Sequence, residues 1–391
     1  MERIVTGGNR AASKPVPGTI VHRRRPEGEL PRRAGVKPHV EDVVTDRRPD
    51  RQNRGSGRDD RAKVVAITGA SAGVGRATAR AFARRGYKLA LLARGREGLV
   101  ATAREIEAIG SEALIVEADV ADEAQVERAA DRIAEKFGRI DIWVNNAFAG
   151  IFSYFTDISP EEYRRVTDVT YLGQVNGTRA ALRHMLERDS GSIILVGSAL
   201  AYRGIPLQSA YCAAKHGLQG FQDSLRSELL ALGSKVRLTM VQLPGLNTPQ
   251  FDWVRSHLDG RPKPIGAVYS PDVAAEAIWL AAHSRRKQII VGAPAWQAIV
   301  AEKFLSPFLD RYLSATAIKG QQEPGPGGGD RPGNLFKPVP GDRGAEGRFG
   351  ASARRRSPLL WASRRRGVVA LAALATTGLG LALLTQGRMK T

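Results

Sequence analysis

Short apolar runs alternate with helical patterns through the middle of the chain, and this alternation constrains the fold most. The strand-like runs are not interrupted by charged residues, as in strands that are buried on both faces. Right-handed crossovers between such strands give a doubly wound parallel sheet, an α/β Rossmann fold. The expected strands lie at residues 63–68, 89–92, 113–116, 142–144, 193–196, 236–241 and 288–291. The expected helices lie at residues 74–85, 97–109, 124–137, 160–187, 210–230 and 272–282.

Charge and composition divide the 391 residues into one domain and two flanks. The chain has 59 Lys and Arg against 39 Asp and Glu, a formal net charge of +20, yet residues 63–314 carry 31 basic and 26 acidic side chains. A nearly balanced segment of this size suits a single α/β domain, which we place at residues 63–292. The single cysteine excludes a disulfide scaffold, and the six histidines have no metal-ligand spacing. No metal site is therefore expected.

The first flank, residues 1–62, is rich in Arg, Pro and Gly and has no sustained apolar period. It cannot bury enough surface to offset the entropy lost on ordering, so we expect a disordered basic arm. Its charge leaves one alternative open, a nucleic-acid-binding protein that acts through basic tails. The balanced domain argues against this alternative, and no nucleic-acid partner is expected.

The second flank combines three kinds of sequence. Residues 293–319 predict a C-terminal helical extension, and the Gly/Pro/Arg-rich residues 320–363 predict a flexible linker. The uncharged run at residues 367–385 follows six arginines and is just long enough to span a bilayer as a C-terminal transmembrane helix. The arginines predict a membrane-anchored protein whose α/β domain faces the cytoplasm.

A Gly-rich turn joins the first expected strand to the first expected helix, with the sequence Thr68-Gly69-Ala70-Ser71-Ala72-Gly73-Val74-Gly75. Glycines allow a sharp turn and a close approach of the backbone to a pyrophosphate. The helix N-terminus adds free N–H groups and a positive dipole end. The turn therefore predicts a dinucleotide site.

The order of the further motifs resembles the short-chain dehydrogenase/reductase family over about residues 63–292. Asn145-Asn146-Ala147 is similar to the family's Asn-Asn-Ala-Gly, and Ser198 precedes Tyr211-Cys212-Ala213-Ala214-Lys215 by 13 residues. The resemblance implies an NAD(P)-dependent oxidoreductase, and a homodimer or homotetramer through the helices near 160–187 and 210–230. The cofactor-binding residues that it implies are Thr68, Gly69, Ser71, Gly73, Val74, Gly75, Asp119, Val120, Asn145, Ala147, Tyr211, Lys215, Pro244, Gly245 and Thr248.

Tyr211 and Lys215 stand four residues apart on an expected helix and so share one face. A free tyrosine has a pKa near 10, and a neighbouring ammonium favours its phenolate and lowers that pKa. Tyr211 is then the general acid or base that exchanges a proton with an alcohol or carbonyl substrate. Ser198 holds the substrate oxygen, and the resemblance implies that Lys215 also binds the nicotinamide ribose.

Two positions depart from the family pattern. Thr170 stands where the family has the Asn that holds a water of the proton relay, and Phe148 replaces the last Gly of Asn-Asn-Ala-Gly. Thr170 is kept as a catalytic candidate because a hydroxyl also binds water. Phe148 has to fit beside the cofactor or turn toward the substrate. The departures leave open a catalytically weak, nucleotide-sensing interaction protein on the same fold.

Arg94, just after the second expected strand, predicts NADP rather than NAD. An acidic residue at this place would bind the ribose 2′-hydroxyl, whereas a guanidinium matches a 2′-phosphate. The substrate is less constrained. Residues 246–269 include Phe251, Trp253 and Leu258, which favour a lipophilic alcohol or ketone.

Overall fold

Residues 62–323 and 333–365 are described in a computed structural model of the chain. Their main feature is a seven-stranded sheet with the order β3-β2-β1-β4-β6-β7-β9, in which every pair is parallel. The strands are β1 (Val64–Thr68), β2 (Lys88–Ala93), β3 (Ala113–Glu117), β4 (Ile142–Asn145), β6 (Ser192–Val196), β7 (Arg237–Gln242) and β9 (Gln288–Ile290). The predicted doubly wound Rossmann fold is confirmed.

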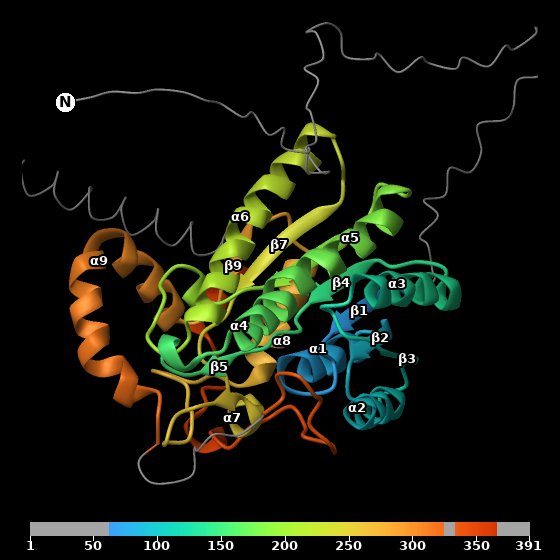
Figure 1. Cartoon of the computed structure of the whole chain (residues 1–391). Helices are drawn as coiled ribbons and strands as arrows, with labels where there is room; N and C mark the ends of the chain where they lie inside the picture. The colour runs from blue at the N-terminus through green and yellow to red at the C-terminus, as the bar shows by residue number, and fades with distance from the viewer. Residues whose placement is uncertain (1–61, 324–332, 366–391) are drawn as a thin grey trace, which may run out of the picture. The chain divides into compact units, whose positions relative to one another are not determined.

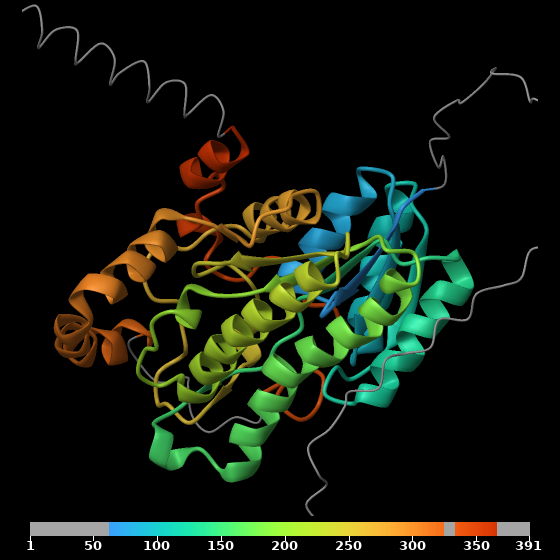
Figure 2. The ribbon, with the colours of Figure 1, turned by 90° about the horizontal axis from the view of Figure 1, so that it is seen from above.

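Helices cover both faces of the sheet (Figures 1 and 2). The helices are α1 (Gly73–Ala83), α2 (Arg96–Ala108), α3 (Glu123–Phe137), α4 (Pro160–Thr167), α5 (Gly173–Leu186), α6 (Ser209–Ala231), α7 (Gln250–Trp253), α8 (Pro271–Ala282), α9 (Ala293–Gly320) and α10 (Pro358–Arg364). A separate parallel pair joins β5 (Ile151–Phe152) to β8 (Arg255–Ser256).

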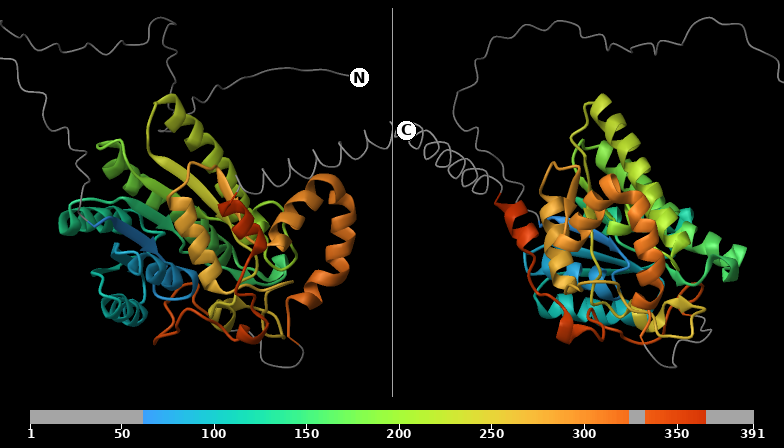
Figure 3. Two further views of the ribbon diagram at one scale, coloured as in Figure 1. Left: turned by 180° about the vertical axis from the view of Figure 1, so that it is seen from behind. Right: turned by 90° about the vertical axis from the view of Figure 1, so that its left-hand side faces the viewer.

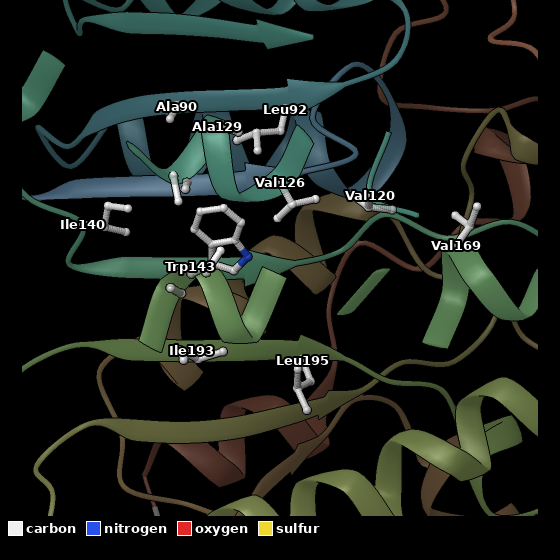
Figure 4. Close-up of a cluster of buried hydrophobic side chains, with 14 of the residues drawn as sticks. Ala90, Leu92, Val120, Val126, Ala129, Ile140, Trp143, Val169, Ile193 and Leu195 are labelled. Atoms are coloured by element: carbon white, nitrogen blue, oxygen red, sulfur yellow. The ribbon is translucent and has the colours of Figure 1, made fainter. Parts of the chain in front are cut away.

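Alternate residues of each strand supply two separate cores, as a strand buried on both faces requires. Val65 and Ile67 of β1 pack with α1, α2 and α8, whereas Val64 and Ala66 belong to the core under α3, α5 and α6. Figure 4 shows Trp143 of β4 in the second core, next to Val126 of α3. The two cores hold the carboxyl ends of β1 and β4 side by side, and ligands bind at this point of such sheets.

The long helix expected at residues 160–187 is interrupted. It consists of α4, a π-helical turn at Asp168–Leu172, and α5. Ser159 precedes α4 and forms a capping box, in which the Ser159 hydroxyl accepts from the Glu162 amide and the Glu162 carboxylate accepts from the Ser159 amide. π-helical turns widen a helix locally and often lie at functional sites. The turn here contains Thr170.

The C-terminal part differs from the prediction. Residues 333–363, expected within a flexible linker, pack against the domain and bury Leu335, Ala345 and Leu360. Helix α9 bends where Leu305 has non-helical dihedral angles, two residues before Pro307. Figure 3 shows α9 in orange at the side of the domain and the later residues in red along its edge.

Two predicted segments lie outside the described residues: the basic arm, apart from Ala62, and the membrane-spanning run at 367–385. Within the described residues, no helix combines the length and the apolar character that crossing a bilayer requires.

Candidate active site

One cavity of about 530 Å³ lies at the carboxyl ends of the central strands. It extends from the Gly-rich turn to the N-terminal part of α6, so it connects the predicted dinucleotide site to the predicted catalytic residues. The predicted site residues on its wall are Gly69, Ser71, Gly73, Val74, Arg94, Asp119, Val120, Ala147, Ser198, Tyr211, Lys215, Pro244, Gly245 and Thr248. The predicted residues that are not on its wall are Thr68, Gly75, Asn145 and Thr170.

The glycines of the turn have separate roles. Gly69 and Gly73 have φ of +68° and +54°, which L side chains rarely adopt. Gly75 is required by packing, because a Cβ built on it would lie 2.1 Å from the Gly69 carbonyl oxygen. The turn at Gly69 and the first and third residues of α1, Gly73 and Gly75, therefore disfavour any side chain.

Thr68 and Asn145, which were expected at the cofactor, have structural roles instead. The Thr68 hydroxyl accepts from the amides of Asn146 and Ala147 at 2.9 and 3.0 Å, which ties β1 to the β4 loop. Asn145 is fully buried, accepts from the Trp143 indole at 2.9 Å and donates to the Thr178 hydroxyl at 3.0 Å. These side chains shape the site without lining the cavity.

Asn146 is one of the cavity residues that the sequence did not predict as part of the site. Its amide nitrogen donates to the carbonyls of Thr68 and Gly69 at 2.9 and 3.3 Å, so it fixes the Gly-rich turn. Alternation along β4 could not have identified it, because Trp143 and Val144 are buried in cores on opposite faces of the sheet. The available signal was its place directly after the strand, between Asn145 and Ala147.

Ser198, Tyr211 and Lys215 come together at the other end of the cavity. Ser198 follows β6, and its hydroxyl accepts from the Leu200 amide at 3.1 Å and hydrogen-bonds Tyr211. Lys215 lies one helical turn after Tyr211 on α6, with its Nζ 5.6 Å from the centre of the tyrosine ring. Its ammonium donates to the Val196 carbonyl at 2.6 Å.

The electrostatics of this group differ from the expectation that Lys215 lowers the pKa of Tyr211. Burial raises the pKa of Tyr211 to about 12, against a smaller opposite effect of the hydrogen bond from Ser198. Burial also lowers the pKa of Lys215 to about 7. The loss of water is therefore the largest effect on both groups, and Lys215 is not among the groups that lower the pKa of Tyr211. Tyr211 is a neutral phenol at pH 7.

This burial makes stability depend on pH. The pKa of Lys215 falls from 10.5 to about 7 on folding, so the unfolded chain binds more protons between these pH values. Stability then rises with pH across the same window. Lys215→Met removes this contribution. Between pH 7 and pH 10, the unfolding free energy of the wild type should therefore rise relative to that of the variant. Denaturant titrations at the two pH values measure this change. A constant difference contradicts the burial of the charge.

The structure places both departures from the family pattern. Thr170 is fully buried, and its hydroxyl donates to the Ala149 carbonyl at 2.7 Å and accepts from the Ala149 amide at 2.9 Å. These two bonds fix the β4 loop and account for the hydroxyl proton. Phe148 lines the cavity and meets the Tyr211 ring edge-on, with the ring centres 5.8 Å apart. It therefore lies at the substrate end of the cavity, beside the phenol.

The substrate end of the cavity is largely apolar. Phe152, the 3₁₀ turn after Ser198, the loop that includes α7, and helix α9 contribute to its wall. The apolar residues of this region are Phe152, Leu200, Ile205, Phe251, Trp253, Val254, Ile265, Ala298, Leu309 and Leu313. Tyr312 of α9 is half exposed and also lines the cavity.

Comparisons with known proteins agree with the fold and the site. Residues 63–259 match the family described as short chain dehydrogenase. YxnA of Bacillus subtilis, an uncharacterised oxidoreductase, is 37% identical over 262 residues, 66% of this chain and 73% of that protein. The 3-oxoacyl-[acyl-carrier-protein] reductase of Bos taurus is 34% identical over 219 residues, 56% of this chain and 90% of that protein.

A solved structure of a short-chain oxidoreductase also has a similar fold. A metagenomic short-chain oxidoreductase in complex with NADP is 28% identical, with a TM-score of 0.50, and the match covers 59% of this chain and 96% of that one. The chain thus belongs to the short-chain dehydrogenase/reductase family and is an oxidoreductase of that class.

Proposed function

We propose that the protein is an NADP-dependent oxidoreductase that interconverts a lipophilic secondary alcohol and a ketone or aldehyde. The observation that carries the proposal is the continuous cavity, which joins the Gly-rich turn to Ser198, Tyr211 and Lys215. The residues present fit a dinucleotide. Glycines stand where side chains would block the turn, and the N-terminus of α1 faces the cavity.

Each residue of the catalytic group has a separate task. A bound nicotinamide supplies or accepts the hydride. The Ser198 hydroxyl holds the substrate oxygen, and the Tyr211 hydroxyl donates its proton to that oxygen during carbonyl reduction. Lys215, when protonated, stabilises the phenolate that remains. Phe148 packs against the phenol and limits the positions that a substrate takes beside it.

The proposed preference for NADP has two supports. No acidic residue follows β2 directly, and Arg94 lines the cavity there. The structural neighbour also binds NADP. We expect kcat/KM to be at least about tenfold higher with NADPH than with NADH, the discrimination expected from one charged contact of about 1.4 kcal/mol or more. Steady-state kinetics with both cofactors test this, and a preference for NADH overturns it.

The lipophilic substrate is proposed from the apolar wall around Phe251 and Trp253. Purified enzyme should oxidise NADPH fastest with ketones or aldehydes that carry apolar substituents of medium length. A panel that pairs each such carbonyl with a hydroxylated analogue of equal size measures this through NADPH absorbance. Equal or faster turnover of the polar partners contradicts the proposal.

Membrane anchoring and self-association also remain proposals. The basis for the anchor is the uncharged run at 367–385 after six arginines, with the domain on the cytoplasmic side. The full chain should stay with membranes in alkaline carbonate, and a chain ending at residue 366 should not.

Sedimentation of the shortened chain should give a homodimer or homotetramer. A monomer contradicts the second proposal.

A further inference from the structure

The segment 333–347, here called the cover segment, contributes residues to the wall of the dinucleotide cavity. Figure 1 shows this part of the chain in orange-red near α7 and α1. At its start, the Asn334 amide donates to the Trp253 carbonyl at 2.9 Å. Arg94 donates from Nη1 to the carbonyls of Leu335 and Phe336 at 3.2 and 3.0 Å, and from Nη2 to that of Asn334. The segment thus begins over the end of β2.

The middle of the cover segment crosses the Gly-rich turn. Asp342 pairs with the buried Arg76 of α1. Two residues later, the Gly344 carbonyl accepts from the Gly73 amide at 3.1 Å. The Gly347 amide then donates to the Asn247 carbonyl at 3.3 Å, in the loop after β7. The segment therefore passes Arg94, then the Gly-rich turn, and then the neighbourhood of Thr248. All three are positions that were expected to bind the dinucleotide.

Space remains under the cover segment. Asn334, Pro338, Val339, Gly341 and Arg343 line the same cavity as Arg94 and the Gly-rich turn. The segment is therefore a wall of the dinucleotide cavity. Its attachment is extensive, because Leu335 is fully buried and Ala345 is 5% exposed.

Arg343 gives this wall a charge. It lies between the two anchors on the turn, Asp342 and Gly344, and it also lines the cavity. Its Nε donates to the Pro340 carbonyl at 3.0 Å, and its side chain is exposed. Within residues 62–323 and 333–365 it forms no ion pair. A pyrophosphate at the N-terminus of α1 would lie within its neighbourhood, and a guanidinium matches phosphate oxygens.

We propose that the cover segment closes over the bound dinucleotide, supplies Arg343 to its pyrophosphate, and has to open before the cofactor can enter or leave. The proposal rests on the proposed function, because it concerns how the same cofactor is held. Arg343 is a further binding residue, contributed by a part of the chain outside the family match at 63–259. Opening breaks the carbonyl contacts with Arg94 and the pair between Asp342 and Arg76.

The first test replaces Arg343. Because NADPH and NADH share the pyrophosphate, Arg343→Ala should weaken the binding of both by about tenfold, the effect of one charge-assisted contact of about 1.4 kcal/mol. Arg355→Ala is the matched control, since Arg355 is also exposed but does not line the cavity. Fluorescence titrations with NADPH and with NADH measure the two dissociation constants. Unchanged or tighter binding overturns the proposal, and a loss confined to NADPH overturns the pyrophosphate assignment.

The second test locks the segment. A Cβ built on Gly95 would lie 3.3 Å from the Pro338 Cβ, close to the separation in a disulfide. The variant Gly95→Cys with Pro338→Cys adds this pair, and the native Cys212 is buried. If the variant is loaded with NADPH and then oxidised, it should retain the cofactor through gel filtration and release it on reduction. If it is oxidised while empty, it should load at least about tenfold more slowly than its reduced form.

The outcomes separate this proposal from the proposed function. If NADPH prevents formation of the disulfide, the segment and the cofactor compete for one place, and the cover is wrong. Equal loading and release in the oxidised and reduced forms also overturn it. If wild type and the reduced variant bind neither NADPH nor NADH, the proposed function itself fails. The control is Pro338→Cys alone, treated with the same oxidant. It should load and release NADPH at the same rates as its reduced form.

Discussion

Tyr211→Phe is expected to lower kcat by about a thousandfold, within the range of about 10²–10⁴ for a lost general acid. The phenol is the group that can give a proton to the substrate oxygen, and burial keeps it protonated at neutral pH. Ser198 can still hold the oxygen, but its aliphatic hydroxyl is a far weaker acid than a phenol and cannot replace Tyr211 as the proton donor. The measurement is single-turnover oxidation of NADPH with a carbonyl substrate from the panel.

Cofactor binding separates a catalytic defect from a folding defect. The substitution removes one oxygen and keeps the ring, so Phe148 retains its edge-on partner. The dissociation constant for NADPH should therefore stay within about twofold of wild type, a change of about 0.4 kcal/mol. Tyr154→Phe is the matched control because Tyr154 is half exposed and does not line the cavity. Turnover that survives in Tyr211→Phe would reject Tyr211 as the general acid, whereas a wild type that binds NADPH without turning over any carbonyl of the panel would leave the nucleotide-sensing alternative in place.

The meeting of Ser198, Tyr211 and Lys215 was predictable because the proposed chemistry restricts the residue types at fixed distances along the chain. Tyr211 and Lys215 must share a helix face, and Ser198 must end a neighbouring strand. The Gly-rich turn was predictable for a similar reason, because few residues other than glycine adopt the conformation of Gly69 and Gly73. Local rules of this kind need no knowledge of the rest of the fold.

The direction of a pKa shift required the fold. Sequence spacing gives the distance between Tyr211 and Lys215, and from that distance alone the ammonium should lower the pKa of the phenol. The structure adds that Lys215 is buried, that Tyr211 is partly buried, and that the ammonium is bound to the Val196 carbonyl. These surroundings come from other parts of the chain, because Val196 ends β6 and Phe148, which packs on the Tyr211 ring, follows β4.

The C-terminal segment was misjudged because glycine content was taken as a sign of flexibility. Gly333, Gly341 and Gly344 have φ of +58°, +80° and +67°, so they form turns of fixed conformation. A Cβ on Gly333 would lie 2.4 Å from the Trp253 carbonyl oxygen. These glycines permit close contact with the domain. Composition does not distinguish this use of glycine from a linker, because the distinction lies in contacts with residues about 80 positions away.

Gly75→Ala is expected to destabilise the protein by about 2 kcal/mol or more, at the upper end of what overpacking costs. The added Cβ would meet the Gly69 carbonyl oxygen at 2.1 Å and the Asn146 amide nitrogen at 2.8 Å. Gly69 is held in a left-handed conformation and by Asn146, so neither neighbour can move alone. The first turn of α1 would shift, and NADPH binding should weaken by more than about tenfold, or about 1.4 kcal/mol.

Gly220→Ala provides the comparison that gives this result its meaning. Gly220 lies within α6, and a Cβ there meets no atom within 4 Å. Alanine in a helix interior should stabilise the protein by about 0.5–1 kcal/mol, because it has less conformational freedom to lose than glycine. The same substitution is thus expected to act with opposite signs at two helical glycines, as measured by denaturant titration. If Gly75→Ala proves as stable as Gly220→Ala and still binds NADPH, then close packing of α1 on the turn does not shape the dinucleotide site.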